Sequence, residues 1–188
     1  MEKYVVKKFV VRIMCILICI GITMSMPACS SESKNEKYTI YYTNSSKDKL
    51  IGSTCMLDVS MSVEDKVRTL LDNMGVRSSS KDEYIIKPDN VNLLESSVKG
   101  KTAFLNFTTT YKQMPSQVEL LYRAAVVKTL TQLDDISYVH FYVDGKEALY
   151  EDGSVMGMFK NSDFTSSDND IRPVSYTHLR AHETGRNL

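Results

Sequence analysis

The sequence has no tryptophan, only four cysteines and only three histidines in 188 residues. Cys15 and Cys19 lie in an apolar N-terminal stretch and Cys29 follows that stretch, which leaves Cys55 alone farther along the chain. No disulfide can therefore form within a domain built from the later residues, and its stability has to come from an apolar core. The alternating pattern around Cys55 predicts a buried structural cysteine in a strand.

Motifs that mark catalytic or nucleotide-binding sites are also missing. The chain has no G-x-S-x-G, P-loop, G-x-G-x-x-G or C-x-x-C pattern. His178 and His182 are spaced for one helical face, but they lack the glutamate and the third ligand of a zinc site. A catalytic constellation needs a nucleophile or an acid–base pair with an orienting partner. The sequence therefore predicts a protein that is not an enzyme and that holds no metal or other cofactor.

A basic surface is missing as well. The whole chain has a formal net charge of zero, and residues 30–171 contain 16 basic and 21 acidic side chains. Nucleic-acid binding needs a concentrated positive field, because the phosphate backbone supplies most of the affinity. The charge pattern therefore argues against a nucleic-acid partner.

The N-terminus does carry a clear feature, a secretory signal. Four basic residues precede an apolar stretch at 13–24, and Ala28 stands directly before Cys29. This order resembles a bacterial lipobox, although Met26 stands where leucine is usual and Pro27 is atypical. We predict a signal peptide at 1–28, a lipid on Cys29 and a polar tether at 29–36 that holds the protein on the outer face of the cytoplasmic membrane. An ordinary cleaved signal and an uncleaved anchor helix are the alternatives.

Residues 37–150 have the pattern of one α+β domain. Apolar alternation and helical periodicity predict the order β-β-α-β-β-α-β-β, with two helices packed on a mainly antiparallel sheet. The six strands of this order are predicted at 38–43, 54–59, 91–98, 102–108, 136–143 and 146–150, and the helices at 62–74 and 116–133. Residues 84–86 are a candidate for a further short strand. Gly100 and Asp144-Gly145 predict hairpin turns.

Local signals also predict how the two helices begin and end. Ser62 with Asp65, and Ser116 with Glu119, have the spacing of capping boxes. Gly75 is placed to end the first helix in the left-handed conformation.

The strand at 136–143 offers the best candidate for a functional face. Val139, Phe141 and Val143 should point into the core, which turns Tyr138, His140 and Tyr142 to the other side. Outward aromatic rings suit the core of an interface, so we predict that these three residues form an interaction face. The alternative is a second covered sheet face in which all six residues are structural.

The pattern resembles the GerMN domain, the sporulation and spore germination family of Gram-positive envelope lipoproteins. The residues that carry the resemblance are YTIYY at 38–42, the helix at 63–74, GKTAFLNF at 100–107, the helix at 118–133 and VHFYVDGK at 139–146. The segment 76–84 departs from the family because it lacks the Gly-Pro that often follows the first helix.

The resemblance implies a fold similar to ring-building domains and a non-enzymatic role in the cell envelope. The implied partners are the membrane, through the lipid, and a sporulation or other envelope complex, or further copies of the same chain. A lipoprotein that captures a small ligand or a wall fragment on its tyrosine-rich sheet face is the alternative.

The end of the chain stands apart. Residues 151–171 form a polar C-terminal extension without a core pattern. Residues 172–188 resemble an adapter-derived sequencing artefact, so we expect a non-native tail there and exclude it from the fold.

Overall fold

The computed structural model describes the backbone of residues 34–167 and 170–173, and the side chains of residues 34–164. The predicted signal peptide, Cys29 and most of the predicted tail, residues 174–188, lie outside this part of the chain.

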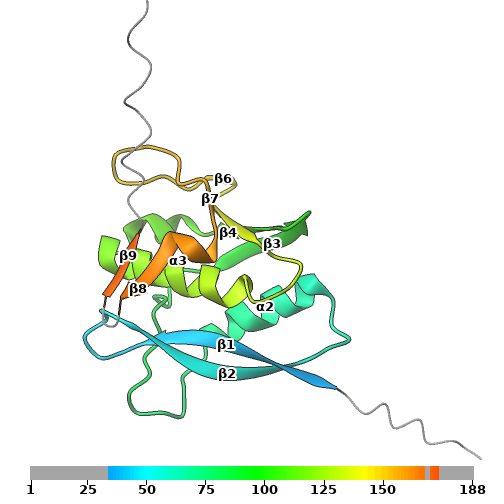
Figure 1. Ribbon diagram of the computed structural model, residues 1–188. Coiled ribbons are helices and arrows are strands. Elements are labelled where there is room, and N and C mark those ends of the chain that lie inside the picture. Colours follow the sequence, from blue (N-terminus) through cyan, green and yellow to red (C-terminus); the bar gives the residue numbers. More distant parts are fainter. Residues whose placement is uncertain (1–33, 168–169, 174–188) are drawn as a thin grey trace, which may run out of the picture. The chain divides into compact units, whose positions relative to one another are not determined.

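The described residues form three layers, with the two helices in the middle (Figure 1). A hairpin of β1 (Asn35–Thr43) and β2 (Leu50–Asp58) covers one side of the helices α2 (Val63–Met74) and α3 (Ser116–Leu130). The second sheet covers the other side and has the order β3-β4-β5-β6, with β7 also paired to β5. Its strands are β3 (Leu93–Lys99), β4 (Thr102–Phe107), β5 (Tyr138–Val143), β6 (Lys146–Glu147) and β7 (Met158–Phe159). The predicted α+β class is confirmed.

Two sheets stand where the sequence of residues 37–150 suggested one, and β8 and β9, which follow later in the chain, form a third. The hairpin β1-β2 pairs only with itself, apart from an isolated bridge between Thr43 and Tyr84. In the larger sheet, β4 and β5 run parallel, while the other pairs are antiparallel. The parallel pair arises because α3 connects β4 to β5 and returns the chain to the starting edge.

Helix α3 is buried around almost its whole circumference. Nine of its 15 residues are buried, and Ala124, Ala125, Val126 and Val127 are consecutive and fully inaccessible. The sequence pattern predicted a helix that packs on a sheet through one face, whereas the buried residues extend around almost the whole helix. A helix that is apolar on all sides is a central core helix, and here β layers lie on both sides of it.

The larger sheet presents one apolar face to α3. Ala103, Leu105 and Phe107 of β4 lie opposite Val139, Phe141 and Val143 of β5, in that order. All six side chains are at most 1% exposed. The turn after β5 has Asp144 at φ 52° and Gly145 at φ 73°, as a type I′ hairpin requires. The Asp-Gly signal is confirmed, although β6 is only two residues long.

The hairpin β1-β2 is fastened to α3 by a side-chain amide just after the helix. The Gln132 Oε1 atom accepts from the Thr39 backbone N–H at 2.9 Å, and Gln132 Nε2 donates to the Thr39 carbonyl at 2.7 Å. One glutamine thus satisfies both backbone groups of an edge-strand residue, as a neighbouring strand would.

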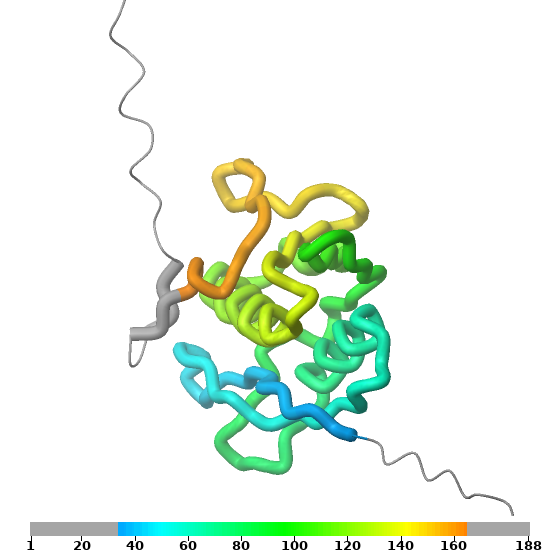
Figure 2. Tube along the Cα trace, turned by 45° about the vertical axis from the view of Figure 1, so that its right-hand side comes forward, coloured from blue at the N-terminus to red at the C-terminus, as the bar shows by residue number. Residues whose placement is uncertain are grey.

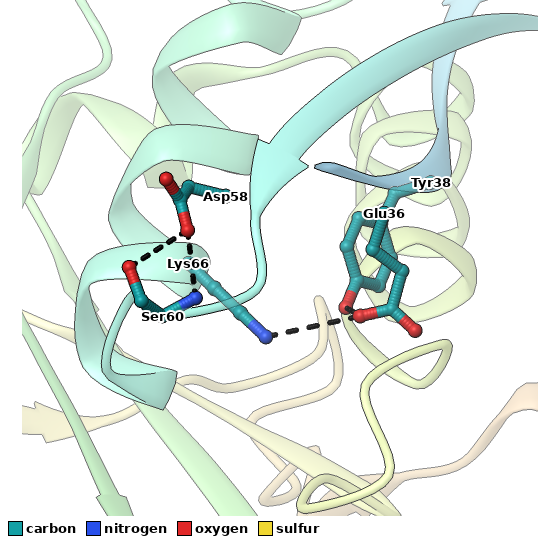
Figure 3. A network of polar contacts seen from close by, with 5 residues as sticks. All are labelled: Glu36, Tyr38, Asp58, Ser60 and Lys66. Carbon is teal, nitrogen blue, oxygen red and sulfur yellow. Dashed lines mark hydrogen bonds and ion pairs between the residues drawn. The ribbon is translucent and has the colours of Figure 1, made fainter. Parts of the chain in front are cut away.

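The start of β1 is held to α2 by a small polar network (Figure 3). The Tyr38 hydroxyl donates to Glu36 Oε2 at 2.6 Å, and Lys66 Nζ lies 3.9 Å from the same oxygen. Burial and the bond to Glu36 raise the pKa of Tyr38 to about 12. Beside it, Asp58 accepts from the backbone N–H and the hydroxyl of Ser60. These contacts fix the place where the chain enters the domain.

Only one of the two serines predicted to start a helix caps it, and neither forms the reciprocal bonds of a capping box. Ser62 is the N-cap of α2, and its Oγ accepts from the Asp65 backbone N–H at 3.1 Å. Ser116 is instead the first residue of α3, after the N-cap Pro115, which makes no side-chain cap bond. The prediction for Ser116 is wrong because Glu119 bonds to Tyr111 and Arg123 and is not free to close the box.

The prediction for Gly75 is also wrong. Gly75 caps α2 at φ −89°, in the right-handed region, and its N–H bonds to Asp72 and Asn73 carbonyls. A left-handed residue is unnecessary there because the chain leaves the helix through a continued tight turn.

The chain continues to pack on the domain beyond residue 150. After β7 it forms η2 (Asn161–Asp163), β8 (Phe164–Ser167) and β9 (Asp170–Pro173). Phe159 and Phe164 are 8% and 3% exposed, and their rings lie 5.7 Å apart, centre to centre. The segment that the sequence indicated as a polar extension therefore adds two aromatic residues to the core.

The two serines permit a direct test of the helix starts. Ser62→Ala should lower the free energy of unfolding by about 1 kcal/mol, because it removes the only side-chain bond to the first turn of α2. Ser116→Ala should have a clearly smaller effect, because its hydroxyl caps nothing. Urea denaturation of both variants measures this. Equal losses would mean that Ser116 caps α3 after all.

Candidate functional site

The predicted face of β5 lies on the side of the sheet away from α3. Parallel pairing places Tyr138, His140 and Tyr142 beside Thr102, Phe104 and Asn106 of β4. The predicted alternation of β5 is confirmed, since Val139, Phe141 and Val143 are buried on the opposite side. We call the set Phe104, Tyr138, His140, Tyr142 and Met158 the outer sheet face.

The three predicted residues differ in exposure. Tyr138 is 40% exposed, Tyr142 is half-buried and His140 is only 9% exposed. The His140 ring lies 4.7 Å from the Tyr142 ring and 5.8 Å from the Phe104 ring, between centres. Its Nε2 atom is 3.4 Å from Glu147 Oε1, without hydrogen-bond geometry, so the contact is an ion pair only when the ring is protonated.

His140 therefore sits beneath its neighbours, while the accessible part of the face is apolar. Met158 lies opposite His140 in the β5–β7 pairing and is 55% exposed. Sequence reasoning missed Glu147, although the predicted Asp-Gly hairpin places it opposite Tyr142. It also missed Met158, because no local pattern encodes the pairing of β7 with β5. The exposed centre of the outer sheet face is thus Tyr138 with Met158.

Three further observations describe the chemistry of the described residues. Among them, no three histidine, cysteine, aspartate or glutamate side chains gather closely enough to hold a metal ion. Cys55 is buried as predicted, and burial raises the pKa of its thiol, which keeps it unreactive at neutral pH. None of the helices in this part of the chain has the length and apolar character to cross a membrane.

A second candidate site is a cleft that the sequence did not reveal. It has a volume of about 710 Å³ and lies between η1 (Thr109–Gln113), the N-terminal half of α3 and residues 148–156, which we call the strap. Figure 2 shows this part of the chain at the opposite end of the described residues from the start of β1.

Two buried polar side chains, Tyr111 and Arg123, meet the partly buried Glu119 in this cleft. The Tyr111 hydroxyl donates to Glu119 Oε1 at 2.6 Å, and Arg123 Nη2 lies 3.1 Å from Glu119 Oε2. The Arg123 guanidinium carbon is 4.7 Å from the Phe159 ring centre and 5.2 Å from that of Tyr150, within the range of cation–π contacts. The buried guanidinium of Arg123 is thus ion-paired with Glu119 and contacted by two aromatic rings.

Burial governs the electrostatics of this group. It raises the pKa of Glu119, although Arg123 and the bond from Tyr111 act in the opposite direction. Burial also raises the pKa of Tyr111 well above the usual value for tyrosine, and the neighbouring Glu119 adds to the effect. Tyr111 therefore remains a hydrogen-bond donor at any physiological pH.

The sequence did contain a signal for this pair. Glu119 and Arg123 are four residues apart in a predicted helix, the spacing of an ion pair on one helical face. The capping-box interpretation assigned Glu119 to the helix start and hid this second possibility.

Residues 39–149 match the family described as Germane, sporulation and spore germination. The chain belongs to the Germane family. No curated protein matches the chain. The match includes Tyr138, His140 and Tyr142 as well as Glu119 and Arg123, but it ends before Met158 and Phe159.

Three solved structures are similar to this Germane-family chain. The first GerMN domain of the sporulation protein GerM from Bacillus subtilis has a TM-score of 0.51 at 19% identity, over 73% of this chain and 98% of that one. The tandem GerMN domains of the same protein give 0.51 at 19% identity, over 72% of this chain and 49% of that one. A candidate lipoprotein from Clostridium perfringens gives 0.46 at 18% identity, over 69% of this chain and 89% of that one. The chain thus spans about half of the tandem structure, and the GerM likenesses show a shared fold.

The buried pair makes a sharp prediction about stability. Glu119→Leu should lower the free energy of unfolding by about 3–5 kcal/mol, because it leaves the Arg123 charge buried without a counter-charge. The double variant Glu119→Leu with Arg123→Met should recover most of that loss, because no charge is then left in the core.

Urea denaturation of both variants decides the matter. A double variant as unstable as the single one would show that the pair does not compensate charge in the core, and that Glu119 acts mainly through its bond to Tyr111.

Proposed function

We propose that this protein is a non-enzymatic, lipid-anchored module of the cell envelope that helps to assemble a sporulation, germination or other envelope complex. The observation that carries the proposal is the outer sheet face. Its opposite side is fully packed against α3, whereas no described element covers Tyr138 and Met158. Membership in the Germane family and the lipobox at Cys29 support the cellular setting.

The composition of this face suits a protein partner. Tyrosine and methionine are enriched in the cores of protein interfaces, and tyrosine buries a large area at little cost in side-chain entropy. Lysine and glutamate, which are depleted in such cores, lie around these five residues rather than among them, at Glu147 of β6 and at Glu95 and Lys99 of β3. The outer sheet face is therefore suited to a mixed apolar contact rather than to electrostatic binding.

The length of the tether limits where that partner lies. Six residue steps separate Cys29 from Asn35, and a fully extended chain of this length spans at most about 20 Å. A lipid on Cys29 therefore keeps the domain close to the membrane surface. The partner is accordingly another protein at the membrane, or a second copy of this chain.

A different observation, the cleft beside α3, favours the alternative class of function, the capture of a small ligand or wall fragment.

The anchor is tested by Cys29→Ala. Without the acyl-accepting thiol, the protein should move from the membrane fraction to the medium or accumulate as an uncleaved precursor. Cell fractionation with mass spectrometry of the processed N-terminus measures both results. Membrane association and mass that do not change in the variant would exclude the lipid anchor.

The outer sheet face is tested by Tyr138→Glu, with Tyr84→Glu as the matched control. The two tyrosines are 40% and 46% exposed, but Tyr84 lies on the loop beside β1. A charge at Tyr138 should weaken assembly at least tenfold, because interface tyrosines are frequent hot spots. The control should assemble normally.

The measurement is self-association of the full-length protein in detergent, together with co-isolation of cross-linked partners from membranes. Circular dichroism checks that both variants are folded. Normal assembly of folded Tyr138→Glu would remove the outer sheet face from the proposal.

A further inference from the structure

The cleft beside α3 has the features of a small-molecule site. Its volume of about 710 Å³ falls within the range of pockets that enclose such ligands. Met114, Leu120, Ala148 and Met156 supply apolar wall, and polar and charged side chains make up the rest of the lining to a similar extent. An apolar wall gives a ligand a place to pack, and polar groups beside it fix the orientation of the ligand.

Among the residues that line the cleft, Arg123 has buried donor atoms without a partner. The residue is 4% exposed, and its Nη2 pairs with Glu119. Its Nε and Nη1 atoms have no hydrogen-bond partner within residues 34–164. Buried donors without acceptors are unfavourable and uncommon in proteins, so they mark a place where an acceptor from outside would fit.

The strap covers Arg123 and is anchored at its base, where the Ala148 N–H donates to the Phe141 carbonyl and the Met156 N–H donates to the Ala148 carbonyl. Its contacts with α3 include the bond from the Ser116 hydroxyl to Glu151 and the Tyr150 ring near the guanidinium. Leu149 and Tyr150 are 45% and 40% exposed, so much of the strap lies in solvent. A modest shift of Tyr150 would open the guanidinium edge to a ligand and would leave the ring free to stack on that ligand.

The charges in the cleft restrict the kind of ligand. Glu119, Glu151 and Asp152 line it together with Arg123 and Lys112. An anionic ligand would meet three carboxylates, and the Arg123 charge is already matched by Glu119. An ammonium group, which only donates, would leave the Arg123 Nε and Nη1 donors without an acceptor. A neutral ligand can satisfy both kinds of group in the cleft. Its hydroxyl groups donate to the carboxylates, and a carbonyl oxygen accepts from Arg123.

We propose that this cleft binds a neutral N-acylated amino sugar. The acyl carbonyl accepts from the free Arg123 nitrogens, and the acyl methyl group rests against the Met114 and Met156 wall. Sugar hydroxyls donate to Glu151 and Asp152, and the apolar face of the ring stacks on Tyr150. This binding needs neither the lipid on Cys29 nor the outer sheet face. An experiment can therefore support or exclude it independently of the assembly role.

The test is calorimetric titration of the full-length protein in detergent with three neutral or cationic trisaccharides. The N-acetylglucosamine trimer should bind saturably. The glucosamine trimer, which is cationic and lacks the acyl group, and the glucose trimer, which is neutral and lacks it, should each bind at least tenfold more weakly.

Variants locate the site. Tyr150→Ala should weaken binding of the acetylated trimer at least tenfold, whereas the control Tyr84→Ala should leave it unchanged. Arg123→Lys keeps the charge beside Glu119 but removes the two free donors, so it should erase the preference for the acetylated sugar. Should Arg123→Lys fail to fold, Tyr150→Ala still locates the site.

Three results would overturn the proposal. They are an absence of saturable binding, equal binding of all three trisaccharides, and binding that Tyr150→Ala does not alter. Saturable binding of a neutral acetylated dipeptide amide in place of the sugar would likewise overturn it and assign the cleft to a peptide.

Discussion

The burial of α3 between two β layers is the constraint on which the rest of this structure depends. The hairpin β1-β2 lies on one side of the helix and the sheet β3-β4-β5 on the other (Figure 1). Consecutive small residues, Ala124 and Ala125, let both layers approach, and consecutive valines fill the space beside them. Neither β layer has enough strands to bury its own apolar face, so each depends on the same helix.

A helix enclosed in this way can carry a charge only if the surrounding elements compensate it. Arg123 meets Glu119 one turn earlier, Tyr111 from η1 bonds to Glu119, and aromatic rings from the strap and β7 cover the guanidinium. The compensation is incomplete, since two guanidinium nitrogens find no partner in the described side chains. The contacts that stabilise the Arg123 charge within the helix therefore leave two donor nitrogens without a partner beside the cleft.

The two candidate sites lie in different parts of this layered structure. The cleft forms where the chain leaves β5 and passes back over α3, and the outer sheet face is the side of the sheet that the helix does not reach. The chain enters the domain at the far end from the strap (Figure 2). The cleft and the outer sheet face share no residue, so both sites could be occupied at once.

The sequence by itself determined the local structure. The alternation in β5, the periodicity of both helices, the Asp-Gly turn, the Ser62 cap and the buried Cys55 were all predictable, because each depends on residues within a few positions of one another. Family membership was recognisable from the same core and turn residues.

Only the tertiary structure decided which distant groups meet. Glu119 was predicted to close a box with Ser116, but the buried Arg123 and Tyr111 compete for its carboxylate more strongly than a solvent-exposed cap does. His140 was expected to face outward, but Phe104, Tyr142 and Glu147 enclose it. The parallel pairing of β4 with β5, the packing of Phe159 and the cleft likewise arise from contacts between segments far apart in the chain, and local periodicity carries no record of those contacts.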